Sequence, residues 1–265
     1  MIQEIQCKSI LQKSRLPESP YCLNPYVGCS HRCAYCYARF MRRFTGHHED
    51  RWGQFVDVKV NADTVLANQL QRRRIDGPVL LGSVCDAYQP IEKKYGLTRR
   101  CIQSLVNYKI PFSVLTKSSL VVRDIDLLKK LPSISVGISL SMRDDAARRI
   151  VEPGASTIEE RLETLKVLHA QGIKTYVFIG PILPEITCIE EIMTAVRDVS
   201  DEIWGEALNL RCGNREDLIQ AYAKLGIPTE WQTLAKSQKY WNSMSQTFEQ
   251  AAHRYKLPLI GFYKH

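Results

Sequence analysis

The chain has 265 residues, of which 45% are hydrophobic, and this is enough for one sizeable core or two small ones. Its first residues, MIQEIQCKSILQK, contain no apolar run of signal-peptide length, and no stretch approaches the roughly 18 apolar residues of a membrane span. We therefore expect a soluble, cytoplasmic protein with no membrane partner. In that compartment thiols stay reduced, so the nine cysteines favour metal or redox chemistry over a disulfide framework.

The charge is strongly basic, with a net value of +8 and a sequence pI near 9.0. Arginines and lysines gather in four stretches: 39–43, 72–74, 93–100 and 143–149. A surplus of this size attracts polyanions by counterion release, which makes nucleic acid a candidate partner. The alternative is that these residues form solvated helix faces.

From residue 56 onward, short β-branched runs alternate with longer helical patterns. The runs predict strands at 56–60, 78–84, 112–117, 134–140, 174–182 and 202–210. Helices are predicted at 118–131 and 156–172, the second with a capping box of Ser156 and Glu159 and with Gly172 at its end. Residues 214–253 predict two or three helices, followed by a short strand at 258–263.

Strand, helix and strand repeated in this way predict a parallel sheet with right-handed crossovers. About six units favour an α/β fold that is a partial (β/α)6-type barrel, with helices outside and a helical C-terminal extension, over a complete eightfold barrel. No linker rich in Pro, Gly or Ser divides the chain. We therefore predict a single domain over 1–265, with a core at about 20–210, an extension at 211–265 and its chemistry at the C-terminal ends of the strands.

The stretch GCSHRCAYCYARF, residues 28–40, places Cys29, Cys33 and Cys36 in a C-x3-C-x2-C spacing. Three thiolates can ligate three irons of a [4Fe–4S] cluster and leave the fourth iron open to bind and activate a small molecule. The alternative is zinc, whose ribbons and fingers normally use a second cysteine pair that this chain does not show. Zinc would draw its fourth ligand from three nearby histidines: His31, His47 and His48.

With an aromatic residue before its third cysteine, this motif resembles that of the radical SAM superfamily. The wider stretch NPYVGCSHRCAYCYAR (24–39) is similar to the branch that includes spore photoproduct lyase and the DNA-repair-photolyase-like proteins. Further similarities are DAYQPIEKKYGLTR (86–99), LTKSSLVVRDIDLL (115–128), ISLSM (138–142) and EPGASTIEERLETLKVLHAQGI (152–173). The resemblance covers about residues 20–210. Within it, Glu152 and Arg161 match the pattern of the branch, either as a structural ion pair or as substrate ligands.

The resemblance implies that Cys29, Cys33 and Cys36 hold a [4Fe–4S] cluster whose open iron binds S-adenosylmethionine (SAM). Reductive cleavage of SAM gives a 5′-deoxyadenosyl radical that abstracts hydrogen from a substrate, with electrons from a donor such as flavodoxin or ferredoxin. The basic charge and the repair-like branch favour nucleic acid as the substrate, in repair or modification. The alternatives are a radical SAM enzyme that modifies a protein or small metabolite, and a zinc-bearing nucleic-acid-binding protein without catalysis.

Residues at the predicted strand ends are the candidates for SAM binding. Gly82 and Ser83 fall where the superfamily presents backbone groups to the methionine amine, and Asp86 can add a carboxylate there or serve as a turn residue. Lys117 is a candidate partner of the methionine carboxylate, because the branch has a lysine in a similar place. Ser139 is a candidate for the ribose hydroxyls.

The resemblance also implies roles for the two tyrosines that flank the third cysteine. Tyr35 matches a tyrosine implicated in cofactor contact, and Tyr37 matches one implicated in hydrogen transfer. Cys85 is a candidate hydrogen donor to a product radical, although the cysteine of the branch aligns nearer Ser83. If the strand continues through this region, Ser83 and Cys85 share one of its faces. The alternative for Cys85 is a small buried hydrophobe.

Overall fold

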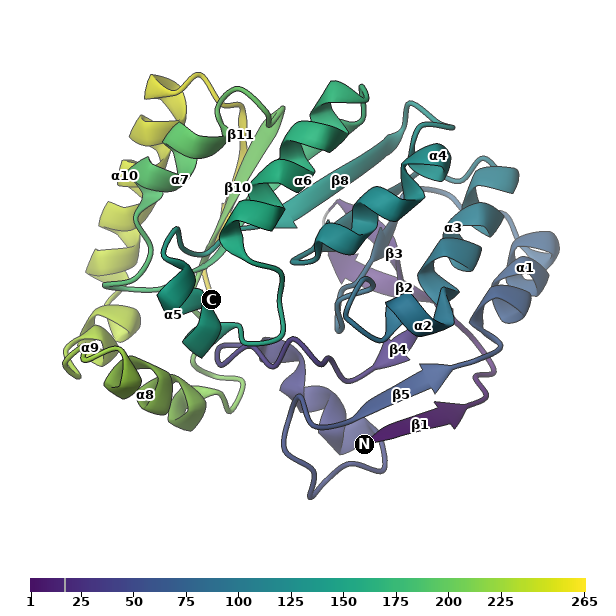
Figure 1. Cartoon of the computed structure of the whole chain (residues 1–265), viewed down its shortest axis with the longest axis horizontal. Helices are drawn as coiled ribbons and strands as arrows, with labels where there is room; N and C mark the ends of the chain where they lie inside the picture. Colours follow the sequence, from purple (N-terminus) through teal and green to yellow (C-terminus); the bar gives the residue numbers. More distant parts are fainter. Residues whose placement is uncertain (17) are drawn as a thin grey trace.

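The computed structural model describes residues 1–16 and 18–265, and its main element is a curved eight-stranded sheet (Figure 1). The strand order is β11-β10-β9-β8-β7-β6-β3-β2. All neighbours pair in parallel except β2 and β3. The strands are β2 (Leu11–Leu16), β3 (Ser19–Leu23), β6 (Val79–Leu81), β7 (Phe112–Thr116), β8 (Ile134–Ser139), β9 (Lys174–Ile182), β10 (Glu202–Ala207) and β11 (Leu259–Tyr263).

Helices cover the outer side of this sheet (Figure 1). The longer helices are α1 (Ala62–Arg72), α3 (Leu97–Asn107), α6 (Ile158–Ala170), α8 (Arg215–Lys224) and α10 (Gln238–Arg254). Shorter helices are α2 (Glu92–Tyr95), α4 (Ile125–Leu128), α5 (Asp145–Val151), α7 (Ile189–Val196) and α9 (Trp231–Lys236), with 3-10 turns η1 (Tyr37–Phe44) and η2 (Ser119–Asp124). None of the helices in the described residues is long and apolar enough to cross a membrane.

Alternation along the strands separates a packed outer face from an open inner face. In β7 and β8, Val114, Val136 and Ile138 are fully buried, whereas Ser113 and Ser135 line a cavity on the inner side. This period of two gives one face to the helices and the other to the cavity. The predicted partial barrel of parallel strands with helices outside is therefore confirmed.

The first strand of the barrel is not the predicted one. Residues 56–60 were expected to begin the parallel sheet, but β5 (Val56–Lys59) lies in a separate sheet between β1 (Ile2–Ile5) and β4 (Tyr26–Val27). The barrel begins instead with β3, which pairs with β6.

The predicted strand 78–84 is shorter than expected. It ends at Leu81 because Gly82 has a φ of +89°, and a Cβ there would lie 3.1 Å from the Cys85 carbonyl oxygen and 3.2 Å from that of Leu115. The chain has thus already turned at Ser83, so the strand on which Ser83 and Cys85 would share a face does not extend to them, although both line the cavity. Strand 202–210 likewise ends early, at Ala207.

Two details of the predicted helices also differ. The region 118–131 contains the 3-10 turn η2 and the single turn α4 in place of one helix. Helix α6 has its capping box one residue later than predicted, on Thr157 and Glu160. The hydroxyl of Ser156 instead accepts a hydrogen bond from the backbone N–H of Ser119 (3.0 Å), which ties η2 to the start of α6.

The C-terminal region contains three helices and then a strand, in agreement with the prediction of two or three helices and a strand at 258–263. The strand is part of the main sheet. After α10, strand β11 adds in parallel to β10 and becomes one edge of the main sheet. The last residues, Tyr263 to His265, line the cavity. The extension therefore contributes to the site as well as to the outer layer.

Candidate active site

A cavity of about 680 Å³ lies on the inner face of the sheet. Its lining includes the cysteine loop, the C-terminal ends of β6 to β10 and residues near Tyr263. All eleven residues predicted for the site line it: Cys29, Cys33, Tyr35, Cys36, Tyr37, Gly82, Ser83, Cys85, Asp86, Lys117 and Ser139. The structure therefore brings together in one cavity residues that are more than 100 positions apart in the sequence.

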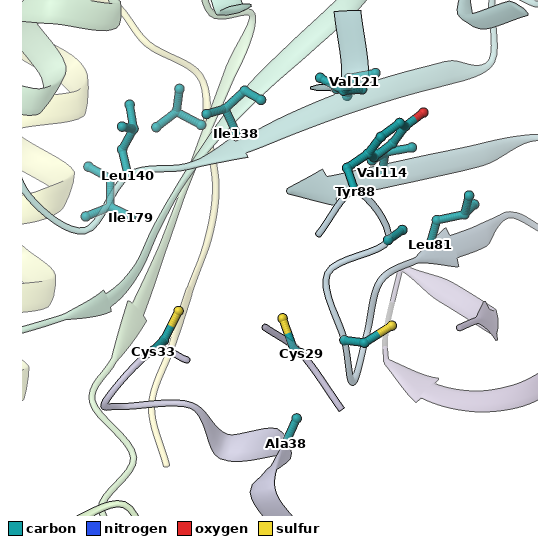
Figure 2. Packing of buried hydrophobic residues seen from close by; sticks show 14 of the residues in the cluster. Cys29, Cys33, Ala38, Leu81, Tyr88, Val114, Val121, Ile138, Leu140 and Ile179 are labelled. Carbon is teal, nitrogen blue, oxygen red and sulfur yellow. The ribbon is translucent and has the colours of Figure 1, made fainter. Parts of the chain in front are cut away.

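The cysteine loop is fixed by backbone and amide contacts. Gln89, which is fully buried, accepts a hydrogen bond from the backbone N–H of Ser30 (2.9 Å) and donates one to the carbonyl of Gly28 (3.1 Å). Gly28 has a φ of +80°, and a Cβ there would collide with Phe55. These contacts orient the cysteines, whose sulfur atoms in Cys29 and Cys33 point from the loop toward the strands (Figure 2).

The three thiols are held in an environment that disfavours a free thiolate. Burial raises the pKa of Cys33 to about 12, raises that of Cys29 well above its usual value and also raises that of Cys36. Metal ligation requires the thiolate, so iron bound here would displace the proton that each buried thiol otherwise keeps. The indole N–H of Trp52 is buried without a hydrogen-bond partner, and it lowers the pKa of Cys36. A metal-bound thiolate at Cys36 would give this N–H an acceptor, and the residues therefore fit an iron–sulfur cluster.

Asp86 organises the turn after β6. Its carboxylate accepts hydrogen bonds from the Thr116 hydroxyl (2.7 Å), the backbone N–H of Lys117 (2.8 Å) and the backbone N–H of Tyr88 (2.9 Å). The ring of His31 lies 3.3 Å away. Burial alone would raise the pKa of Asp86, but His31 and these hydrogen bonds hold it well below its usual value. The carboxylate is thus ionised and largely occupied by the protein itself.

Lys117 and Tyr35 belong to a second network. The ammonium of Lys117 lies 5.5 Å from the centre of the Tyr35 ring, and the Tyr35 hydroxyl donates to the buried carboxylate of Glu152. Glu152 also pairs with Arg161, which donates to the Ser139 carbonyl (3.0 Å). Burial opposes ionisation of Glu152, yet Arg161 and Lys117 keep its pKa below the usual value. Of the two interpretations of Glu152 and Arg161, the structure supports a buried ion pair that joins the cysteine loop to β8.

Asn24 is a site residue that sequence reasoning missed. Its amide donates to the hydroxyl of Ser83 (3.0 Å), and its oxygen accepts from the backbone N–H of Val84 (3.0 Å) and from the thiol of Cys85 (3.6 Å). Cys85 is buried but lines the cavity, and burial raises its pKa to about 12, so it is a neutral thiol with a hydrogen to give. The sequence did contain one indication of this role, because Asn24 begins the NPYVGC stretch that leads into the cysteine motif.

Tyr37 lines the cavity and begins a row of aromatic side chains along η1, which we call the aromatic ladder. Its hydroxyl donates to the Ser83 carbonyl, and its ring stacks on Phe40 (6.4 Å between centres). Phe40 contacts Phe44 edge to face (6.3 Å), and Phe44 is 76% exposed. Arg43 lies in the same turn, is exposed and has no acidic partner among residues 1–16 and 18–265.

A second aromatic group lines the inner wall of the cavity on β9 to β11. Tyr176, Phe178, Trp204 and Tyr263 all face it, and the rings of Trp204 and Tyr263 stack at 5.9 Å. Gly180 leaves room for this wall, because a Cβ there would collide with the Phe178 ring. The wall offers flat apolar surface opposite the polar residues at the ends of β6 and β7.

In the described part of the chain, no three His, Cys, Asp or Glu side chains converge as the ligands of a single metal ion do. The cysteines of a cubane cluster bind separate irons, so such convergence is not required of them. This chain combines a half-barrel sheet with a three-cysteine loop that lines the cavity on its inner face. This combination is typical of a class of cofactor-dependent enzymes.

The chain belongs to the radical SAM superfamily, whose family description matches residues 23–199. It is therefore an enzyme, and its cofactors are a [4Fe–4S] cluster and SAM. This membership sets aside the zinc-bearing alternative.

Several relatives are similar over most of the chain. An uncharacterized protein of Methanocaldococcus jannaschii is 35% identical over 88% of this chain and 86% of its own length. A radical SAM Nalpha-GlyT isomerase of Pseudomonas phage M6 is 28% identical over 63% of this chain and 34% of its own length. Spore photoproduct lyase of Clostridium acetobutylicum is 24% identical over 72% of this chain and 55% of its own length.

The fold is also found in solved structures. Spore photoproduct lyase complexed with a dinucleoside spore photoproduct superimposes with a TM-score of 0.73 at 14% identity, covering 100% of this chain and 82% of that one. Streptococcus suis SuiB bound to the precursor peptide SuiA gives a TM-score of 0.57 at 13% identity, covering 92% of this chain and 48% of that one. At these identities the likeness concerns the fold.

Proposed function

We propose that this enzyme holds its cluster on Cys29, Cys33 and Cys36 and acts on nucleic acid, in repair or modification. When bound, the cluster and SAM supply a 5′-deoxyadenosyl radical that abstracts a hydrogen atom. The unpartnered N–H of Trp52 and the three cavity-lining thiols support the cluster ligands. Cys→Ala at any one of them should remove most of the iron.

The residues proposed to bind SAM have different tasks. Lys117 supplies a cation to a carboxylate; burial opposes its charge, but the neighbouring negative charge of Glu152 contributes to keeping its pKa raised. Asp86 positions Lys117, because three hydrogen bonds and His31 occupy its lone pairs. Ser139, together with Gly82 and Ser83 and the ring of Tyr35, completes the binding surface.

Cys85 and Tyr37 are proposed to transfer hydrogen. The thiol of Cys85 would give one hydrogen atom to a carbon radical of the product, so that an S–H bond breaks and a C–H bond forms. The resulting thiyl radical would take a hydrogen atom from the hydroxyl of Tyr37. Tyr37 donates to the carbonyl of Ser83, whereas Cys85 donates to Asn24, whose amide bonds the Ser83 hydroxyl, and this common turn supports a transfer between the two residues.

The observation that carries the choice of nucleic acid is the exposed ladder of Tyr37, Phe40 and Phe44, which starts at the cavity with Tyr37 and has the exposed Arg43 in the same turn. Aromatic side chains stack on bases, and adjacent cations follow the phosphates. The wall around Trp204 and Tyr263 offers a flat surface for a base taken out of its strand. Spore photoproduct lyase, which shares the fold, was seen with a dinucleoside photoproduct.

The experiment is an isotope-transfer assay with purified, anaerobic holoenzyme and a reductant. Candidate DNA and RNA, irradiated or not, are uniformly deuterated, and deuterium is sought in 5′-deoxyadenosine or in recovered SAM. Deuterium transfer from a nucleic acid would support the proposal. Cleavage of SAM without transfer from any nucleic acid would reject the substrate while leaving the radical SAM chemistry intact.

Modification of a protein is the second candidate, because the fold is shared with SuiB, which was seen with a precursor peptide. The same assay with deuterated peptides distinguishes the two. We further infer that the chain acts in the cytoplasm as a single domain, and that it receives electrons from a flavodoxin or a ferredoxin.

A further inference from the structure

The cysteine loop has two faces. Cys29, His31 and Cys33 line the active-site cavity, whereas the intervening Ser30 and Arg32 line a separate open groove of about 730 Å³. A single thickness of backbone therefore separates the groove from the cysteines. This groove opens between α2 and the small sheet that contains β1 and β5.

The lining of the groove combines apolar surface with positive charge. Arg32, Lys93 and Lys94 supply exposed cations, and Ile2, which is 57% exposed, and Ile91 supply apolar contact. None of the described residues that line the groove is a carboxylate. An apolar centre with a charged rim is typical of a surface that binds another protein.

The groove is rigidly tied to the cysteine loop. Gln89 holds Ser30 and Gly28 from the segment that leads into α2. Arg32 adopts a φ of +53°, which is unusual for a residue with a side chain, and its stem packs so closely on Gly53 that a Cβ there would collide with it. A partner in the groove would therefore meet a fixed surface directly behind the cysteines.

We propose that this groove, which we call the rear groove, is the docking site of an acidic one-electron donor protein of the flavodoxin or ferredoxin type. The inference rests on the proposed placement of the cluster on Cys29, Cys33 and Cys36. One electron passes from the reduced donor to the cluster, the donor is oxidised by one electron, and no bond or proton is exchanged. Close approach matters because electron transfer weakens steeply with distance.

Position favours an acidic protein over nucleic acid at this face, because positive charge alone attracts both. The rear groove is lined by the side of the loop opposite to the cavity, so a strand bound there could not present a base to the cavity lined by Cys85 and Lys117. The stacking ladder of Tyr37, Phe40 and Phe44 starts instead from Tyr37, which lines the cavity and not the groove. The donor and the substrate can then bind at the same time.

The test measures the rate of cluster reduction by stopped-flow absorbance near 400 nm in the anaerobic holoenzyme. The donors are an acidic flavodoxin, reduced beforehand, and a photoreduced deazaflavin, which is small and does not need a docking site. The variant is Lys93→Glu/Lys94→Glu, and a milder form is Lys93→Gln/Lys94→Gln. The matched control is Lys236→Glu/Lys239→Glu, which makes the same charge change on two exposed lysines of the C-terminal helices.

We expect the Glu variant to lower the second-order rate constant with flavodoxin by about tenfold or more, within the range of electrostatic steering, and the Gln variant to lower it less. Reduction by deazaflavin should be unchanged in all variants. An unchanged rate with flavodoxin, or an equal loss in the control, would overturn the docking site. Loss of DNA binding without loss of reduction would assign the groove to nucleic acid instead. Because the readout is reduction of the cluster, a failure of substrate turnover would count against the proposed function alone.

Discussion

Trp52 is a single side chain whose hydrogen bonding fits the proposed iron–sulfur cluster. Its buried N–H has no partner in the thiol form of the site, and it lies beside Cys36. Hydrogen bonds to cluster sulfurs raise the reduction potential of iron–sulfur centres. We therefore expect Trp52→Phe to shift the midpoint potential to more negative values with little loss of iron, as measured by redox titration with EPR detection.

The control for this prediction is Trp204→Phe. Trp204 also has a buried, unpartnered N–H, but it belongs to the β10 wall of the cavity. Its replacement should leave the potential unchanged. Equal potentials for wild type and Trp52→Phe would show that the indole does not bond to a cluster ligand.

Lys117 permits a test of SAM binding. A hydrogen bond to a charged group contributes about 1.5–3 kcal/mol, so Lys117→Ala should weaken SAM binding by about 10- to 100-fold. Anaerobic calorimetry gives the dissociation constant. Lys174→Ala is the control, because Lys174 begins β9, is exposed and pairs with Glu202. An unchanged dissociation constant in Lys117→Ala removes Lys117 from the SAM site.

Cys85 permits a test of hydrogen donation. Its sulfur lines the cavity, as a donor requires, so Cys85→Ala should leave SAM cleavage intact and divert the product radical to side products. Chromatography of the products with mass detection would show them. Cys101→Ala is the control, because Cys101 is fully buried in α3 and does not line the cavity. The same products at the same rate in Cys85→Ala would leave Cys85 with a packing role.

The sequence predicted which side chains line the site, but it did not predict the hydrogen bonds that hold those side chains in place. The three cysteines and Lys117 follow from spacing and from resemblance. Asn24 and Gln89 act through hydrogen bonds to residues about 60 positions away, and such pairings have no local signature. The role of Asp86 also depends on Thr116, whose distance from it in sequence hides the contact.

Among the elements, the segment after the cysteines is fixed by a buried histidine. The ring of His47 lies between the carboxylates of Asp50 (2.6 Å) and Asp57 (2.9 Å) and stacks on Phe55. Burial alone would lower the pKa of His47, but the two carboxylates raise it overall. A raised folded-state pKa means that the protonated ring stabilises the fold fully below the unfolded value of about 6.5, and that this contribution is lost as pH rises through the folded-state pKa.

We therefore expect His47→Gln to lower the free energy of unfolding by about 1–3 kcal/mol at pH 6, and by less at pH 9. Urea unfolding at the two pH values measures this difference. His169→Gln is the control, because His169 is 41% exposed and lies 3.8 Å from Asp201, so its loss should change little. A loss for His47→Gln that is equal at both pH values would show that the imidazole contributes by packing alone.

The sequence predicted most strands, but it did not predict which strands pair with one another. VDVKV was recognised as a strand, but its pairing with β1 and β4 was not, because pairing depends on segments distant in the chain. SPYCL was missed as the first barrel strand because it is short and contains a proline that disfavours strands. The strands from residue 112 to 207 were predicted well because each is a short run rich in β-branched and apolar residues between polar segments.

For the whole molecule, the net charge of +8 overstates the free positive surface. Several arginines in the basic stretches are already paired, including Arg39 with Asp217, Arg100 with Asp63 and Arg148 with Asp145. The exposed Arg43 is not, within the described residues, and it lies on the aromatic ladder. The exposed cations of the rear groove are assigned to the electron donor, so we expect a polyanion to bind at Arg43 and the aromatic ladder.

We expect single-stranded DNA to bind with an affinity that falls steeply with salt, with a log–log slope of about −0.7 per phosphate neutralised. Arg43→Ala should reduce the magnitude of this slope by about 0.7, because one phosphate contact is lost. Phe44→Ala should weaken binding by about 1–3 kcal/mol and leave the slope unchanged, because stacking releases no counterions. Fluorescence anisotropy at a series of salt concentrations measures both quantities.

Lys236→Ala, in the exposed part of α9, is the control and should change neither. If Arg43→Ala and Lys236→Ala reduce the slope equally, binding follows the overall charge and the aromatic ladder is not the nucleic-acid site.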